Sequence, residues 1–153
     1  MIRDNDLKRC EGLGWFFTDE AAETMDLSLV KKLLKEQNEK SFGLPIKFGW
    51  DEVRHGGLLN ATKEPCLLIA NKEHVEDYFR YCITLHKQGR RLNMQCYYCG
   101  QSTLTGKKHA EEEREKSIGG MILNMLTRVD QTKVDEEYTY YNELDNLIKE
   151  TFA

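Results

Sequence analysis

Residues 78–100 read YFRYCITLHKQGRRLNMQCYYCG, and the stretch alternates apolar and polar side chains on both sides of a glycine. A period of two is the spacing of a β-strand, in which successive side chains point to opposite faces of the sheet. Gly89-Arg90 is typical of a type II′ two-residue turn, because glycine adopts the positive φ of the first central position without a steric clash. The stretch therefore predicts a long β-hairpin.

The length of the turn also predicts which residues of the hairpin pair. A two-residue loop sets Gln88 opposite Arg91, and the apolar pairs follow in steps of two: Leu85 with Met94, Ile83 with Cys96, and Tyr81 with Tyr98. All of these apolar side chains then share one face, whereas a loop one residue longer would set apolar side chains against polar ones. The opposite face is half polar and is expected to be partly in water or covered by a loop; it carries Arg80, Cys82, Thr84, His86, Asn93, Gln95, Tyr97 and Cys99.

The composition is that of one globular domain spanning residues 1–153. The chain is long enough to bury a core, and its hydrophobic share of 40% and charged share of 31% exclude a disordered protein. The net charge of -4 argues against broad non-specific binding to nucleic acid. The sequence contains no apolar run near the ~20 residues that span a bilayer, and its first ten residues are too charged for a signal peptide. We therefore expect a cytoplasmic protein without membrane partners, whose five cysteines are reduced.

Outside the hairpin, the spacing of apolar residues predicts helices near both ends and strands between them. Residues 1–14 form a polar lead-in, and a helix is expected to start at Thr18-Asp19-Glu20, after an aromatic cluster. The remaining predicted elements are an amphipathic helix over 26–40, strands over 46–50 and 66–70, a helical stripe within 107–129 and a last helix from 134 onward. The fold class expected from this order is α+β: an antiparallel sheet of about four strands with the long hairpin at its centre, flanked by N-terminal and C-terminal helices.

Cys96-Tyr97-Tyr98-Cys99 has the spacing of half a zinc knuckle. A structural zinc site needs four ligands, and the sequence lacks a second such pair, so the others would come from Cys66, Cys82, His86 or His109. Cys82 and Cys99 are predicted to share a face, whereas Cys96 points to the other face unless the strand bends at Tyr98. The candidate metal ligands are thus Cys82, Cys96 and Cys99. The alternative is that they are ordinary buried cysteines and that the protein has no cofactor.

The tip of the predicted hairpin is basic. Lys87, Arg90 and Arg91 lie beside the turn, and Tyr97 on the polar face is placed to stack on a base. A basic β-ribbon can enter a DNA groove or follow an RNA backbone. The alternative is that these are the solvated charges normal at an exposed turn.

The two C-terminal helices carry more methionine and tyrosine than a core needs. Met121, Met125, Tyr138 and Tyr141 are of the residue types common at protein interfaces, although the same residues also suit helices that cover a sheet. The sequence offers neither a nucleophile-base-orienter set nor a glycine-rich phosphate loop, which argues against an enzyme.

Three functional hypotheses follow from these patterns. The first is a small non-enzymatic interaction module that acts through a protein partner or by self-association. The second is a nucleic-acid-binding regulator that uses the hairpin tip, with or without zinc. The third is an enzyme with a pocket that gathers Arg80, Cys82 and His86 on the polar face of the hairpin.

Overall fold

The computed structural model of the chain describes residues 1–57, 59–74, 78–100 and 131–153. The chain divides into two compact units, one formed by Met1–Gly100 with Asp145–Ala153 and the other by Gln101–Leu144. The predicted stripe within 107–129, with Met121, Met125 and His109, lies outside the described residues. A single domain over 1–153 therefore stays a prediction.

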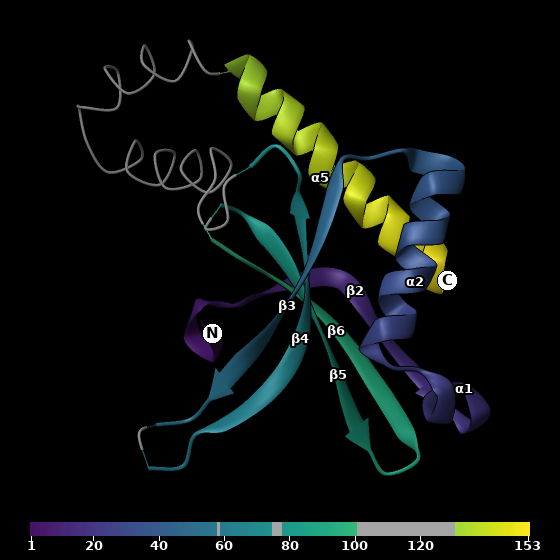
Figure 1. Cartoon of the computed structure of the whole chain (residues 1–153), viewed down its shortest axis with the longest axis vertical. Helices are drawn as coiled ribbons and strands as arrows, with labels where there is room; N and C mark the ends of the chain where they lie inside the picture. The colour runs from purple at the N-terminus through teal and green to yellow at the C-terminus, as the bar shows by residue number, and fades with distance from the viewer. Residues whose placement is uncertain (58, 75–77, 101–130) are drawn as a thin grey trace. The chain divides into compact units, whose positions relative to one another are not determined.

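The first unit is built on a six-stranded mixed sheet with the strand order β1-β3-β4-β5-β6-β2 (Figure 1). The strands are β1 (Ile2–Arg3), β2 (Lys8–Thr18), β3 (Ile46–His55), β4 (Thr62–Asn71), β5 (Arg80–Gln88) and β6 (Arg91–Cys99). All neighbours pair antiparallel except β1, which runs parallel to β3. The α+β class is confirmed. The prediction of about four antiparallel strands is corrected to six strands in a mixed sheet, because the N-terminal residues contribute β1 and β2.

The predicted hairpin is confirmed residue by residue. β5 and β6 pair Gln88 with Arg91, and the four predicted pairs, including Leu85 with Met94, are all present. Gly89 has a φ of +62°, and Asp19 is the one non-glycine residue with positive φ in the described part of the chain. Arg90 therefore has a negative φ, as a type II′ turn requires.

Strand β2 was not predicted because an irregularity interrupts its alternation. The pairing of β2 with β6 shifts register between Arg9 and Gly14, and Gly12 in that interval has a φ of +75°. An irregularity of this kind resets which side chains face inward, so a period of two is not visible across it. Beyond the shift, Trp15 and Phe17 lie 5.8 and 6.2 Å from the ring of Phe152, measured between ring centroids.

The helices follow local signals in the sequence. α1 (Asp19–Thr24) begins at the predicted residue, and α2 (Leu27–Gln37) continues into a π-helical turn, η2 (Asn38–Phe42). The Asp26 side chain accepts a hydrogen bond of 2.7 Å from the backbone N–H of Leu29, which caps α2. Gly43, with a φ of +66°, ends this segment. The last helix is α5 (Gln131–Phe152), and no helix among the described residues is long and apolar enough to cross a membrane.

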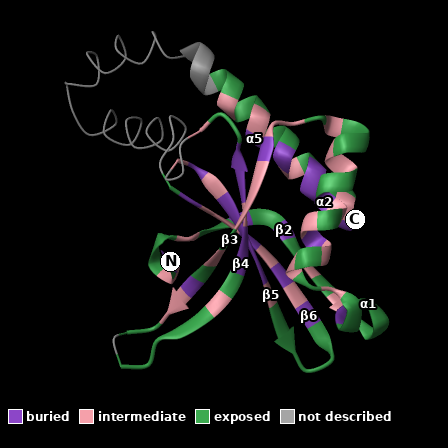
Figure 2. Cartoon of the chain, viewed as in Figure 1, coloured by how far each residue is buried: buried purple, intermediate pink, exposed green. Residues whose placement is uncertain are grey.

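The main core lies between the sheet and two helices, α2 and the final turns of α5 (Figure 2). Val30 and Leu34 of α2 and Leu147 and Ile148 of α5 are at most 1% exposed. The two helices are joined by Gln37, whose amide donates to Glu150 Oε2 at 3.4 Å. We call this side of the sheet the helix face. Its buried strand residues include Ile46, Leu67, Ile69, Tyr81, Ile83, Leu92, Met94 and Cys96.

Candidate functional site

The opposite side of the sheet, here called the far face, carries a second and smaller core. Ile2 of β1 lies opposite Val53 of β3, and both are at most 5% exposed. Around them are gathered Cys66, Cys82 and Cys99, with Leu7, Leu68 and Tyr97 packed at the margin. The N-terminal segment, which includes the 3₁₀ turn η1 (Asp4–Asp6), thus covers the middle of the far face.

The structure brings two of the three candidate metal ligands together and places the third elsewhere. Cys82 and Cys99 lie in the far-face core, whereas Cys96 is fully buried on the helix face, beside Cys10. This separation follows from strand parity, because residues three apart in a regular strand point to opposite faces. Within residues 1–57, 59–74, 78–100 and 131–153, no three His, Cys, Asp or Glu side chains form a group suited to a metal ion.

Three of the buried cysteines, Cys82, Cys96 and Cys99, have a raised pKa that favours the thiol form. The hydrogen bond between Cys66 and Cys82, together with burial, raises the pKa of Cys82. Burial raises the pKa of Cys99, and burial with the hydrogen bond to Cys10 raises the pKa of Cys96. Because the thiolate is the reactive form, these environments disfavour nucleophilic or redox use of the three cysteines.

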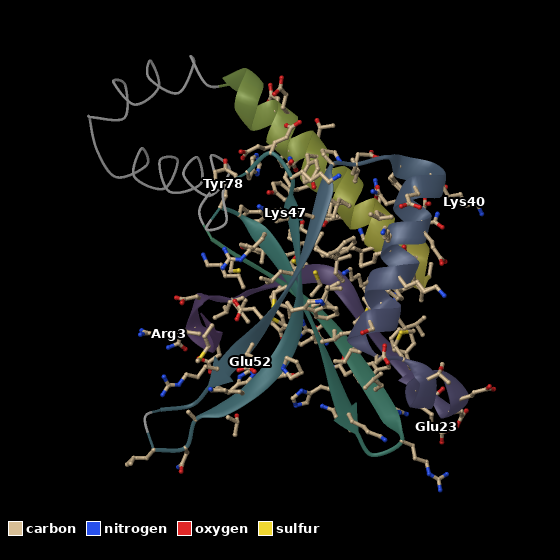
Figure 3. The ribbon with its side chains drawn as sticks, in the orientation of Figure 1. Arg3, Glu23, Lys40, Lys47, Glu52 and Tyr78 are labelled. Atoms are coloured by element: carbon tan, nitrogen blue, oxygen red, sulfur yellow. The ribbon has the colours of Figure 1, made fainter. Side chains whose placement is uncertain are left out.

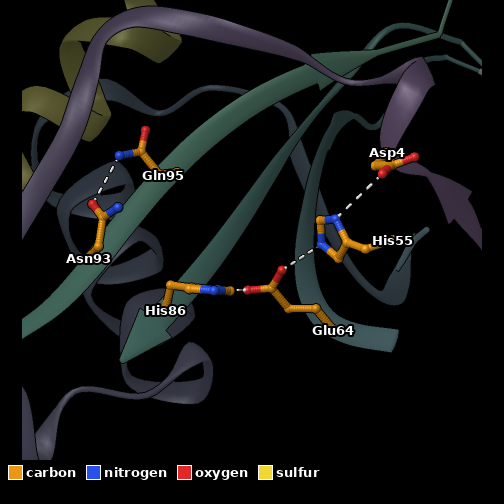
Figure 4. Close-up of polar contacts among 6 residues, drawn as sticks. All are labelled: Asp4, His55, Glu64, His86, Asn93 and Gln95. Carbon is orange, nitrogen blue, oxygen red and sulfur yellow. Dashed lines mark hydrogen bonds and ion pairs between the residues drawn. The ribbon is translucent and has the colours of Figure 1, made fainter. Parts of the chain in front are cut away.

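A polar cluster lies where β3, β4 and β5 meet on the far face (Figure 4). The Glu64 carboxylate accepts a hydrogen bond from His55 Nε2 at 2.8 Å and another from His86 Nδ1 at 2.7 Å. His55 Nδ1 lies 3.7 Å from Asp4 Oδ2, which links the cluster to the N-terminal segment. Of this cluster, sequence reasoning named only His86 as a candidate; Glu64 was missed because it meets the two histidines only through the register of three strands.

The hairpin end of the far face is aromatic and polar. Phe16 of β2 lies opposite Asn93 of β6 and is 58% exposed, and Tyr97 lies further along β6 on the same face. Gln95 Nε2 donates to Asn93 Oδ1 at 2.9 Å. The predicted basic residues of the tip, Lys87, Arg90 and Arg91, are all exposed.

The residues of the C-terminal helices that were predicted to form an interface differ in their exposure. Tyr138 is 60% exposed, whereas Tyr141 is 5% exposed and contacts the ring of Tyr140. Met121 and Met125 lie outside the described residues. Of these four, Tyr138 is therefore the residue that the structure shows at a surface.

The outer edge of β3 is paired with β1 over only two residues. β1 pairs with β3 only at Val53 and Arg54, so within the described residues no strand lies beside the outer edge of β3 over 46–52. Figure 3 labels Lys47 and Glu52 on this stretch. An unpaired edge presents backbone N–H and C=O groups that can pair with another extended chain.

A hollow of about 360 Å³ opens beside this edge. It is lined by Lys47, Phe48, Gly49, Trp50 and Asp51 of β3, by Leu68 and Ala70 of β4, and by Arg80 of β5. Gly49 and Ala70 are small, so they leave room for the hollow between the larger side chains of the lining. A Cβ added to Gly49 would lie 3.7 Å from Leu68 Cβ, an ordinary contact, so the glycine is not needed to relieve a clash.

Among the described residues, the charged side chains that line the hollow are those of Lys47, Asp51 and Arg80. Lys47 Nζ donates to the backbone oxygen of His74 at 3.1 Å, and Arg80 Nη1 donates to that of Tyr78 at 3.3 Å. Asp51 accepts from the Met1 ammonium at 3.1 Å. Burial acts to raise the pKa of Asp51, but the hydrogen bonds from the Glu52 backbone N–H and the Met1 ammonium, with the charges of that ammonium and of Arg80, lower it overall. Asp51 therefore stays ionised and is paired with the Met1 ammonium.

The pocket expected for an enzyme does not coincide with this hollow, which Arg80 lines but Cys82 and His86 do not. No protein-family model, curated protein or solved structure matches the chain. Function is therefore inferred from the residues themselves. In the described part of the chain, they offer a strand edge without a neighbouring strand, a hollow beside it, and exposed aromatic side chains.

Proposed function

We propose that this protein is a non-enzymatic interaction module that binds a protein partner by adding an extended segment of that partner to the edge of β3. The observation that carries the proposal is the edge of β3 over 46–52, beside which no strand lies among the residues that the structure describes, with a hollow next to it. Strand addition is a common mode of peptide recognition, in which backbone hydrogen bonds give affinity and flanking pockets give specificity.

The side chains along this edge support a controlled interaction rather than indiscriminate pairing. Lys47, Asp51 and Glu52 place charges on the stretch, and charged edge residues are a usual protection against aggregation. Trp50, in contrast, is 53% exposed, and tryptophan is enriched at the energetic centres of protein interfaces. A partner strand that complements both the edge charges and Trp50 should therefore bind more tightly than a strand of arbitrary sequence.

Strand addition can be tested with a fluorescein-labelled peptide of alternating valine and threonine, followed by fluorescence anisotropy. We expect saturable binding. Two further peptides carry N-methyl groups on alternate residues, one on each set. Because the N–H groups of an added strand point alternately toward and away from β3, one N-methylated peptide should lose binding and the other should keep it. Equal binding of both, or none by the parent peptide, would argue against strand addition.

A second candidate function, nucleic-acid binding at the hairpin, is favoured by the exposure of Phe16 on the same face as Tyr97 and next to a basic tip. Aromatic side chains on an open sheet can stack on single-stranded bases. We place it second because Arg91 pairs with Thr18, directly before the acidic first turn of α1, which reduces the positive potential there.

The test of this candidate is a salt titration of binding to a short single-stranded RNA of mixed sequence. If the tip contacts phosphates, Arg90→Glu with Arg91→Glu should weaken binding. It should also reduce the slope of log K against log salt concentration by an amount that corresponds to roughly two phosphate contacts. The charge-matched control is Lys32→Glu with Lys35→Glu on α2, which should leave the slope unchanged. Identical behaviour of the two variants would exclude the tip as the binding surface.

A further inference from the structure

We infer that the extended segment that adds to the edge of β3 is β3 of a second copy of the chain, aligned antiparallel and centred on Gly49. This inference rests on the proposed function and names the partner. Residues 47–51 read Lys-Phe-Gly-Trp-Asp, which is a cation, an aromatic ring, a glycine, an aromatic ring and an anion. When two copies of this stretch run in opposite directions, each cation meets an anion and each ring meets a ring. The stretch is therefore complementary to itself, as a two-fold symmetric interface requires.

The two ends of the edge set the centre of the pairing. β1 pairs with β3 from Val53 onward, so an added strand can extend to residue 52. At the other end, Pro45 has no backbone N–H, and its carbonyl accepts from the N–H of Lys72 at 3.3 Å. The stretch that can pair is thus 46–52, and its midpoint is Gly49. Two antiparallel copies that overlap over this whole stretch set Gly49 opposite the partner's Gly49.

On the far face, this register pairs opposite charges twice. Lys47 lies opposite the partner's Asp51, and Asp51 opposite the partner's Lys47. Lys47 Nζ donates to the backbone oxygen of His74 at 3.1 Å, and an ammonium has three donors. The Met1 ammonium at 3.1 Å and the Glu52 backbone N–H at 2.7 Å both bond to Asp51 Oδ1, and a carboxylate accepts through two oxygens. Opposite charges at directly facing positions stabilise an antiparallel pair of strands.

On the helix face, the same register pairs aromatic rings. Phe48 lies opposite the partner's Trp50, and Trp50 opposite the partner's Phe48. Within one chain, Lys31 Nζ lies 5.9 and 5.7 Å from the centroids of the Phe48 and Trp50 rings, so both rings share this face. Trp50 is 53% exposed, and a facing Phe48 would cover part of it. Facing aromatic side chains stabilise paired strands, and the apolar area removed from water adds to this.

Other alignments of the two strands lose these matches. A parallel alignment in register sets Lys47 against the partner's Lys47 and Asp51 against the partner's Asp51, and like charges at facing positions destabilise the pair. An antiparallel alignment centred on Trp50 sets Lys47 opposite the partner's Val53, which already pairs with β1. One centred on Phe48 sets Asp51 opposite the partner's Pro45. The alignment centred on Gly49 keeps both charge pairs.

The test measures the mass of the full chain by light scattering over a concentration series. We expect a reversible increase from one chain toward two. Lys47→Glu and Asp51→Lys each place like charges at both facing pairs and should weaken dimerisation by about tenfold. An equimolar mixture of these two variants should regain the affinity of the wild type, because both facing pairs of the mixed dimer again carry opposite charges. The control Lys63→Glu, outside the hollow lining, should leave dimerisation unchanged.

A second measurement tests the same register without changing a charge. The chain has two tryptophans, so Trp15→Phe leaves Trp50 as the remaining one. Its emission should shift to shorter wavelength as the protein concentration rises, because dimerisation removes the ring from water. In the wild-type background, Trp50→Ser should weaken dimerisation by about tenfold through the loss of both aromatic pairs. Urea unfolding of each variant establishes that it is folded.

The outcomes separate this inference from the proposed function. The valine-threonine peptide is titrated against Lys47→Glu, which is expected to be monomeric and keeps the backbone edge. If this peptide binds and the wild type stays monomeric at every concentration, strand addition stands and self-pairing is wrong. If neither a dimer nor peptide binding is found, both fail. A dimer that both charge variants retain, or a mixture that dimerises no better than either variant alone, would place the contact on another surface and overturn the inference.

Discussion

Tyr81 and Asp145 form a buried polar contact between β5 and the final turns of α5. The Tyr81 hydroxyl donates to Asp145 Oδ1 at 2.6 Å. Burial raises the pKa of Asp145 above its ordinary value of 3.8, although the bond from Tyr81 and the charge of Lys149 oppose this. Burial, with the nearby carboxylate, also raises the pKa of Tyr81, so the hydroxyl remains a donor. The folded protein thus holds a proton on Asp145 more tightly than the unfolded chain does.

This difference predicts the effect of Asp145→Asn. Because the folded pKa is raised, the contribution of Asp145 to stability is fully present below pH 3.8 and is lost as pH rises through the folded value. Asparagine keeps an oxygen that accepts from Tyr81 and cannot ionise, so the variant should be more stable than wild type at neutral pH, with the difference vanishing below pH 3.8. Urea unfolding at both pH values measures this. Glu143→Gln, an exposed change on the same helix, is the control, and a less stable Asp145→Asn at neutral pH would contradict the argument.

At the scale of elements, β4 joins its neighbours through side chains as well as through the backbone ladder. Glu64 bonds His55 of β3 and His86 of β5, and His55 in turn lies near Asp4 of η1. Both imidazoles are partly exposed, whereas the Glu64 side chain is 15% exposed. These contacts link the N-terminal segment, β3 and β5 to the Glu64 carboxylate, which is largely buried.

We expect Glu64→Gln to lower the free energy of unfolding by about 1 kcal/mol, since each partly exposed pair contributes a few tenths to one kcal/mol. Glu52→Gln, an exposed glutamate on the neighbouring strand β3, should change it by less than half as much. A double-mutant cycle of Glu64→Gln with His86→Gln isolates the pair between β4 and β5. A coupling free energy of zero would mean that the contact adds nothing to stability.

At the scale of the whole molecule, the features that sequence reasoning predicted are those with local causes. The hairpin register follows from Gly89 and the alternation beside it, and the end of the α2 segment follows from Gly43. The opposite orientations of Cys96 and Cys99 follow from strand parity alone. These features need no knowledge of distant contacts.

The features that were missed depend on strand order or on contacts distant in sequence. β1 has two residues, too few for a periodic pattern, and the irregularity after Arg9 hides β2. Within the described residues, β3 has no neighbour over 46–52 because β1 is short, and Glu64 meets His86 because β4 and β5 are neighbours. Their residues are visible in the sequence, but their proximity is decided by the assembled sheet.

Cys82 and Cys96 lie on opposite sides of the sheet, so labelling of each thiol reports the exposure of one side. Cys96 is concealed on the helix face near Asp145, and Cys82 lies beneath the N-terminal segment on the other face. Both are fully buried, so a thiol-alkylating reagent can reach them only after the covering element moves away. The order in which peptides bearing Cys82 and Cys96 gain the alkyl mass will therefore tell which layer of the protein opens first.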